Sequence, residues 1–175
     1  MQTKCELTVG KASIRPFGHI TQFMGKVGPN IFIEINSEAC ILRGLDNSNA
    51  SFGSATFHHT FFERFQAPQS TIRCKVAVKC FIAAFKNLRG VNALEMHFGN
   101  SDIESVLEFR LRCHMGIVKK YTLGTEDCEI FDAVFDAPSC LNQLECSSQK
   151  LSQIFSHLYR NNQAAMHLAD DFLRV

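Results

Sequence analysis

The chain has little excess charge of either sign, and it has no long apolar run. Charged residues make up 20% of its 175 residues and the formal net charge is +1, which argues against a disordered chain and a uniformly basic nucleic-acid binder. No stretch approaches the ~20 apolar residues of a membrane span, and the N-terminus lacks the apolar core of a signal peptide. We therefore expect a soluble intracellular protein without a membrane partner. Any DNA contact has to come from a local arrangement of charges.

Motifs for nucleotide, metal and nucleophilic chemistry are also missing. The chain has no Gly-rich phosphate loop and no Gly-x-Ser-x-Gly elbow. Its eight cysteines lack the C-x2–4-C pairing of zinc sites; the nearest approaches are Cys74 with Cys80, Cys113 beside His114, and Cys140 with Cys146. We predict no metal, no cofactor and no catalytic residues.

The cysteines and histidines have simpler structural interpretations. Four thiols lie in or beside apolar segments and are expected to be buried and free: Cys5, Cys74, Cys80 and Cys113. His58 and His59 precede Thr60, which is expected to cap a short helix, so exposed or capping histidines are favoured over a catalytic dyad. A small cysteine-dependent hydrolase or redox protein is the alternative of another class. It would need one thiol with a depressed pKa beside a histidine.

Hydrophobic periodicity predicts the same order of elements twice. The first copy is a strand, a helix and three strands, at Thr3–Thr8, Ser13–Lys26, Ile31–Ile35, Cys40–Leu45 and Phe52–Phe57. The second copy has the same order, at Thr71–Val78, Lys79–Leu88, Ala93–Phe98, Val106–Cys113 and Ile117–Leu123. A third helical pattern at Leu151, Ile154, Phe155 and Leu158 precedes one or two strands within Met166–Val175. This repetition predicts an α+β architecture of strand–helix–strands units.

The two predicted helices have opposed faces. One face is apolar, with Ile14, Phe17, Ile20 and Met24 in the first helix and Phe81, Phe85 and Leu88 in the second. The other face carries cations and no acid: Lys11, Arg15 and Lys26 with the first helix, and Lys79, Lys86 and Arg89 with the second. If the repeat places the helices side by side, these charges form one surface that follows DNA phosphates without reading bases.

Several collinear motifs resemble the Rad-nine subunit family of the checkpoint (9-1-1) sliding clamp, whose ring is PCNA-like. The matching motifs are Phe61-Phe62 with Phe65-Gln66; Arg73-Cys74-Lys75; Phe81 with Phe85 and Leu88; Cys113-His114-Met115-Gly116-Ile117 with Lys120 and Leu123; Asp127-Cys128-Glu129; and Ala133-Val134-Phe135-Asp136 with Cys140. Together they cover most of the segment from Phe61 to Cys140 in the expected order.

The resemblance implies a DNA-clamp fold with helices on one face of a curved antiparallel sheet and lining a central channel. It implies a first clamp domain at residues 1–136, an interdomain connector at 137–150 and an incomplete start of a second domain at 151–175. The six cations above would then face double-stranded DNA. A non-enzymatic subunit of a heterotrimeric checkpoint and repair clamp is the implied function, located in the nucleus, with two other clamp subunits, a clamp loader and repair or checkpoint proteins as partners.

The segment Gly116–Leu123 is the predicted edge strand for pairing with a neighbouring subunit, through Ile117, Val118 and Tyr121. Its two lysines are consistent either with edge protection or with an acidic partner surface. Tyr121→Pro is expected to abolish association while leaving the monomer folded. Since the chain ends at Val175, before a full second domain, a truncated or decoy isoform that binds clamp partners without closing a ring is the alternative. The acidic residues Asp102 with Glu104, and Glu126, Asp127 and Glu129, are expected in solvated turns, not in a two-metal nuclease site.

Overall fold

The computed structural model describes two units of the chain. Residues 5–48, 50–100, 105–129 and 132 are described in the first unit, which spans Met1–Asp132. Residues 145–158, 165, 167–168 and 173–174 are described in the second, which spans Ala133–Val175. Among the described residues, no helix has the length and apolar composition needed to cross a bilayer.

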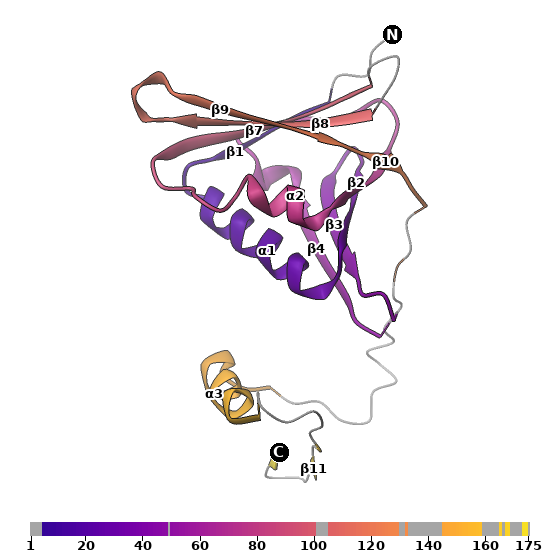
Figure 1. Cartoon of the computed structure of the whole chain (residues 1–175), viewed down its shortest axis with the longest axis vertical. Coiled ribbons are helices and arrows are strands. Elements are labelled where there is room, and N and C mark those ends of the chain that lie inside the picture. Colours follow the sequence, from indigo (N-terminus) through magenta and orange to yellow (C-terminus); the bar gives the residue numbers. More distant parts are fainter. Residues whose placement is uncertain are drawn as a thin grey trace. The chain divides into compact units, whose positions relative to one another are not determined.

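The first unit contains the two predicted copies of the repeat (Figure 1). The first copy comprises β1 (Cys5–Gly10), α1 (Ile14–Val27), β2 (Asn30–Ile35), β3 (Ala39–Leu45), β4 (Phe52–His58) and the short β5 (Arg64–Gln66). The second comprises β6 (Ile72–Ala77), α2 (Val78–Ala83), β7 (Val91–Asn100), β8 (Ser105–Cys113), β9 (Val118–Gly124) and the short β10 (Glu126–Asp127). Short 3-10 turns, η1 (His59–Phe61) and η2 (His114–Gly116), follow β4 and β8.

The two copies exchange their first strands. One antiparallel sheet has the order β5-β1-β7-β8-β9, and the other has the order β10-β6-β2-β3-β4. The first strand of each copy therefore pairs with the three-strand set of the other copy, as in Leu7 opposite Met96 and Ile33 opposite Cys74. Because of this exchange, neither copy forms a complete sheet without the other.

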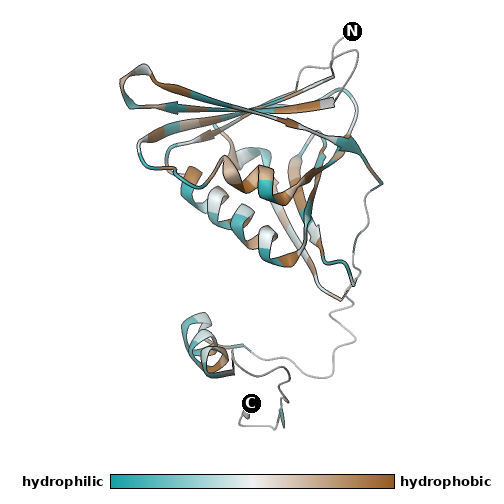
Figure 2. Ribbon diagram, viewed as in Figure 1, coloured by the Kyte–Doolittle hydropathy of each residue, from teal (hydrophilic) through white to brown (hydrophobic). Residues whose placement is uncertain are grey.

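The core lies between the inner faces of the two sheets, and α1 and α2 lie in the angle between them (Figure 1). Strand alternation supplies the sheet side of the core: in β2, Ile31, Ile33 and Ile35 are buried. The aromatic rings of Phe17 on α1 and Phe57 on β4 have centroids 4.9 Å apart, so the helix is anchored directly on the sheet. Figure 2 shows the resulting alternation of hydrophobic and hydrophilic residues along α1.

Two glycines of α1 allow α2 and the segment after it to approach closely. A Cβ atom on Gly18 would lie 2.7 Å from Leu88 Cδ1, and one on Gly25 would lie 2.2 Å from Ile82 Cδ1. Gly18, near the start of α1, meets Leu88 beyond the end of α2, and Gly25, near the end of α1, meets Ile82 within α2. The two helices therefore run antiparallel. The N-terminal end of α1 therefore lies beside the turn that follows α2.

The second helix is shorter than predicted, because α2 ends at Ala83 instead of continuing to Leu88. The Asn87 side chain accepts a hydrogen bond from the Arg89 N–H (3.2 Å), and Gly90 adopts a φ of +76°. Both features are typical of turns, and they outweigh the apolar spacing that favoured a longer helix. Lys86 and Arg89 thus lie in a turn between α2 and β7.

Two smaller predictions also need correction. Glu126 and Asp127 form the short strand β10 instead of a solvated turn, because they pair with Lys75 and Cys74 of β6. The turn η1 begins at His59 with no side-chain cap, so Thr60 does not cap a helix. Asp102 and Glu104 lie outside the described residues.

The second unit contains α3 (Ser148–Leu158) and the paired β11 (His167–Leu168) and β12 (Leu173–Arg174). The third helical pattern therefore forms a helix. It begins three residues earlier than predicted, so the end of the predicted connector (137–150) is helical; residues 137–144 of it lie outside the described residues. The assignment of this unit to a second clamp domain remains a prediction.

Candidate nucleic-acid interface

Each helix turns its apolar face to the sheets and its cations to solvent. Phe17 and Met24 on α1, and Phe81 on α2, are at most 1% exposed. The six predicted DNA-facing cations are all exposed, and we call them the basic lane: Lys11, Arg15, Lys26, Lys79, Lys86 and Arg89. They lie in the β1–α1 turn, on α1, on α2 and in the turn after α2.

The antiparallel arrangement of the helices divides the basic lane into two ends. Gly18 is beside Leu88, so Lys11 and Arg15 lie toward the turn that contains Lys86 and Arg89. Gly25 is beside Val78 and Ile82, so Lys26 lies toward Lys79 at the start of α2. Cations that are far apart in the sequence are thereby brought to the same surface.

The side chains of the basic lane have no ion-pair partner among the residues that the structure describes. One reason is visible in the sequence, where no Asp or Glu occurs within residues 7–33 or within residues 64–94. Both helices fall inside these acid-free stretches. The Glu63 carboxylate lies against Gly10, next to Lys11, but none of the six cations forms an ion pair among the described residues, so their charge is available to an external anion.

The cations of the sheets behave differently, because seven of them form ion pairs with nearby carboxylates: Arg43, Arg64, Arg73, Lys75, Arg110, Arg112 and Lys120. Lys75 Nζ lies 2.9 Å from Glu126 Oε2, and this hydrogen bond raises the pKa of Lys75. Burial raises the pKa of Glu108, but hydrogen bonds from Lys120 and Arg110 outweigh it and leave that pKa below its ordinary value. The sheet cations are thus engaged in ion pairs, whereas the cations of the basic lane are not.

A cavity of about 320 Å³ opens at the first end of the basic lane. Lys11 and Arg15 line it together with His114, which comes from the β8–β9 hairpin. No sequence pattern predicts that His114 joins these cations, because it lies about 100 residues further along the chain. The hydrogen bond from the His114 N–H to the Gly90 carbonyl (3.0 Å) holds the hairpin against the α2–β7 turn.

Three buried thiols are unsuited to be the nucleophile of the cysteine-dependent alternative. Burial raises the pKa of Cys5 and of Cys74 to about 12, and it raises the pKa of Cys40 further. These thiols stay protonated near neutral pH, whereas a nucleophile needs the thiolate. Cys113 is half-buried, as its place at the end of β8 allows.

One thiol prediction is wrong: Cys80 is exposed, because it lies on the outward side of α2 next to Lys79. Cys140 lies outside the described residues. Among the side chains that the structure describes, no three His, Cys, Asp or Glu residues converge in a way that could hold a metal.

The predicted edge strand is β9, at the end of its sheet. Ile117, just before β9, and Val118 are 56% and 54% exposed, and the neighbouring Met115 is 97% exposed. Tyr121 is instead partly buried and packs against the core. Its side chain therefore faces inward, unlike the two aliphatic residues predicted with it.

The ladder between β8 and β9 shows which backbone groups of the edge are free. The backbone N–H of Cys113 donates a 2.7 Å hydrogen bond to the Ile117 carbonyl. The register of the two strands continues without a shift to Val106 opposite Gly124. Hydrogen-bonded and non-bonded pairs alternate in an antiparallel ladder, so the N–H groups of Lys120 and Thr122 point away from β8 while that of Tyr121 points into the sheet. Tyr121→Pro would therefore remove a bond within the unit, and Thr122 is the better position for proline.

The Rad9 protein-family model matches residues 17–171, which is most of the chain. The chain belongs to the Rad9 family. The family predicted from the collinear motifs is thereby confirmed.

Two relatives carry names that indicate their roles. The chain is 28% identical over 121 residues to the cell cycle checkpoint control protein Rad9 of Drosophila melanogaster, across 69% of this chain and 26% of that protein. It is 25% identical over 187 aligned residues to the DNA repair protein rad9 of Schizosaccharomyces octosporus, across 87% of this chain and 43% of that protein. The chain thus spans less than half the length of either relative.

Solved sliding clamps have the same fold. PCNA from Thermococcus kodakaraensis superposes with a TM-score of 0.63 at 17% identity, across 76% of this chain and 51% of that one. The PCNA2–PCNA3 complex from Sulfolobus tokodaii gives a TM-score of 0.59 at 15% identity, across 79% and 51%. The predicted α+β, PCNA-like clamp fold is confirmed.

Proposed function

We propose that this Rad9-family chain is part of a non-enzymatic subunit of a heterotrimeric DNA sliding clamp of the 9-1-1 type. It acts in checkpoint signalling and DNA repair in the nucleus, with two other clamp subunits and a clamp loader as partners. Its basic lane faces double-stranded DNA and contacts the phosphates without reading sequence. The names of its relatives and its clamp fold support the checkpoint, repair and clamp parts of this proposal.

The proposed DNA contact rests on a difference between the helices and the sheets in how their cations are paired with carboxylates. Seven sheet cations are engaged by carboxylates, whereas the cations of the basic lane have no acid within their own stretches of sequence. Exposed, unpaired cations on one surface bind phosphates weakly and with strong salt dependence. Weak, sequence-independent contacts suit a ring that slides.

The free edge of β9 supports a subunit interface there. Exposed edge strands pair readily with another chain. The apolar side chains of Ile117 and Val118, at the start of this edge, are exposed to water in the isolated unit and would be buried by such a neighbour. The outward N–H groups of Lys120 and Thr122 are the donors such a neighbour would use. Lys120 already pairs with Glu108, so edge protection and partner docking are not exclusive.

The experiment is size-exclusion chromatography with light scattering on the chain alone and mixed with candidate partner clamp subunits. We expect an assembly that contains one copy of this chain and two partner subunits. Thr122→Pro is expected to prevent that assembly while preserving the folded unit, because proline is tolerated where an edge N–H faces solvent. Thr122→Ala, which keeps the N–H, is the matched control and is expected to assemble normally.

Other outcomes separate the alternatives. A persistent monomer in every mixture would contradict a ring subunit. A complex with one partner that never gains the third subunit would indicate a truncated or decoy isoform. Normal assembly of Thr122→Pro would remove β9 as the interface and leave the ring proposal in place.

A further inference from the structure

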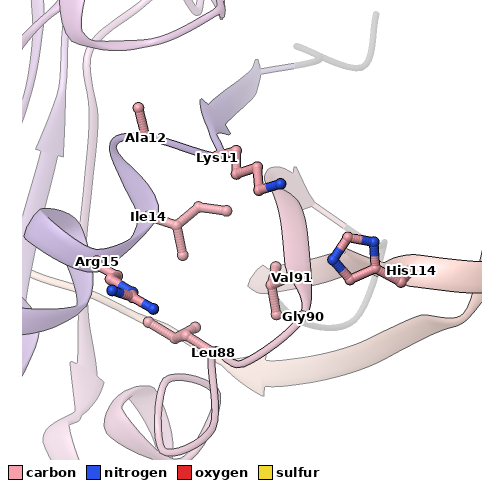
Figure 3. A pocket seen from close by; sticks show the side chains of 8 residues that line it. All are labelled: Lys11, Ala12, Ile14, Arg15, Leu88, Gly90, Val91 and His114. Carbon is pink, nitrogen blue, oxygen red and sulfur yellow. The ribbon is translucent and has the colours of Figure 1, made fainter.

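The cavity at the first end of the basic lane is built from three separate segments. Lys11 and Arg15 come from the β1–α1 turn and α1, Leu88 and Gly90 from the α2–β7 turn, and His114 from the β8–β9 hairpin. Figure 3 shows the Lys11 chain extending toward His114, with Arg15 across the space over Leu88. Its volume of about 320 Å³ is at the lower end of the range for small-molecule pockets, ~300–1,000 Å³.

The polar side chains of this cavity are cationic or can donate hydrogen bonds, and no acid lines it. Its floor is apolar: Ile14 and Val91 are 2% and 5% exposed. A low-dielectric floor strengthens the attraction between the two cations and an anion bound above it.

The N-terminus of α1 adds unused donors beside Arg15. Ser13 makes no side-chain cap, and the first turn contains no acidic residue. The Ser13 N–H is satisfied by the Gly10 carbonyl (2.9 Å), whereas the N–H groups of Ile14 and Arg15 have no acceptor four residues earlier; Pro16, the third residue of the helix, has no N–H. An anion at this point would accept from them and would favour the positive end of the helix dipole.

The ring of His114 is turned toward the same space. The Asn92 side-chain amide lies 3.4 Å from His114 Nδ1, which leaves Nε2 available to a ligand. Figure 3 shows a ring nitrogen directed into the cavity, and the other nitrogen is the one beside Asn92.

We propose that Lys11, Arg15 and His114 form a phosphate pocket that holds one backbone phosphate of DNA. This inference rests on the proposed function, because Lys11 and Arg15 also belong to the basic lane. The pocket gives the otherwise uniform lane one fixed contact, at the end where α1 begins. A free phosphate compound has the same chemistry, and the experiment distinguishes the two sources.

The first arm uses inorganic phosphate as the probe on the full chain. Phosphate replaces chloride at constant ionic strength while the melting temperature is recorded. We expect phosphate to raise the melting temperature of the wild type, because a ligand of the folded state stabilises it. Arg15→Gln and His114→Gln are expected to weaken phosphate binding about tenfold each, the effect of losing a hydrogen bond with a charged partner.

Lys150→Gln is the matched control, since it removes one exposed charge from α3, outside the basic lane. It is expected to keep the full phosphate effect. Circular dichroism in chloride checks that each variant folds. Equal phosphate effects in Arg15→Gln, His114→Gln and Lys150→Gln, or none in the wild type, would overturn the pocket.

The second arm compares DNA binding by the assembly with partner clamp subunits, with and without His114→Gln. Weaker DNA binding in the variant supports a DNA phosphate as the occupant. If phosphate binding is lost but DNA binding is unchanged, the occupant is a free phosphate compound and the assignment to DNA is overturned. If the wild-type assembly binds no DNA while the chain binds phosphate, the proposed function fails and the pocket stands.

Discussion

Replacing the three cations of α2 and its following turn tests the basic lane in the most quantitative way. The variant Lys79→Gln, Lys86→Gln, Arg89→Gln removes three exposed charges without touching the apolar face of the helix. These side chains have no ion-pair partner among the described residues, so the fold should be nearly unaffected. The assay is DNA binding by the assembly of this chain with its partner clamp subunits, measured over a series of salt concentrations.

The magnitude follows from counterion release. Each phosphate neutralised contributes ~0.9 to the slope of log affinity against log salt, so three lost contacts lower the slope by about 2.7. Over a fourfold rise in salt, from about 50 to about 200 mM, the wild type should lose about 40-fold more affinity than the variant. Affinity should fall equally for all DNA sequences, because phosphate contacts carry no sequence information.

The matched control removes three cations from the sheet that contains β9. Arg64→Gln, Arg110→Gln, Arg112→Gln changes the net charge by the same amount, but these side chains pair with Glu6, Glu108 and Glu95. We expect its salt slope to match the wild type. Equal slope changes in both triple variants would show that net charge, and not the basic lane, controls binding.

Three further outcomes follow from packing and burial. Phe81→Ala should lower the free energy of unfolding by about 3–5 kcal/mol in urea titrations, because this 1%-exposed ring contacts two other phenylalanines; a loss below about 1 kcal/mol would contradict its core role. Gly28→Ala should cost about 1–3 kcal/mol, since its Cβ would lie 1.9 Å from the Leu45 carbonyl oxygen; an unchanged melting temperature would show that the backbone relaxes freely. A thiol reagent at neutral pH should label the exposed Cys80 in the native protein and Cys74 only after unfolding, as resolved by peptide mass spectrometry; equally fast labelling of Cys74 would contradict its burial and raised pKa.

Local sequence patterns predicted the elements of the fold well. The spacing of Ile14, Phe17 and Met24 predicted α1, and the alternation of Ile31, Ile33 and Ile35 predicted β2, because one face of each element must be buried. The exchange of β1 and β6 between the copies was not predictable in this way. Strand pairing depends on contacts between residues far apart in the chain, and periodicity carries no information about partners.

The candidate site was likewise predictable where it depends on local sequence, and not where it depends on residues far apart in the chain. The lack of acids around the two helices identified the basic lane, since exposure of a charged face follows from burial of the opposite one. The phosphate pocket was missed because His114 meets Lys11 only through the β8–β9 hairpin. The inward direction of Tyr121 was missed for a related reason: its face depends on the register with β8, in which it lies opposite Phe109.

We propose that this chain helps to encircle DNA, and topological retention distinguishes encirclement from ordinary electrostatic binding. The assembly with two partner clamp subunits is loaded by a clamp loader onto closed circular DNA and washed at high salt. A ring held by topology stays bound after the phosphate contacts of the basic lane are screened, and it is released when the same DNA is cut once. We predict retention on the circle and loss after linearisation; equal release from circular and linear DNA at high salt would contradict the account.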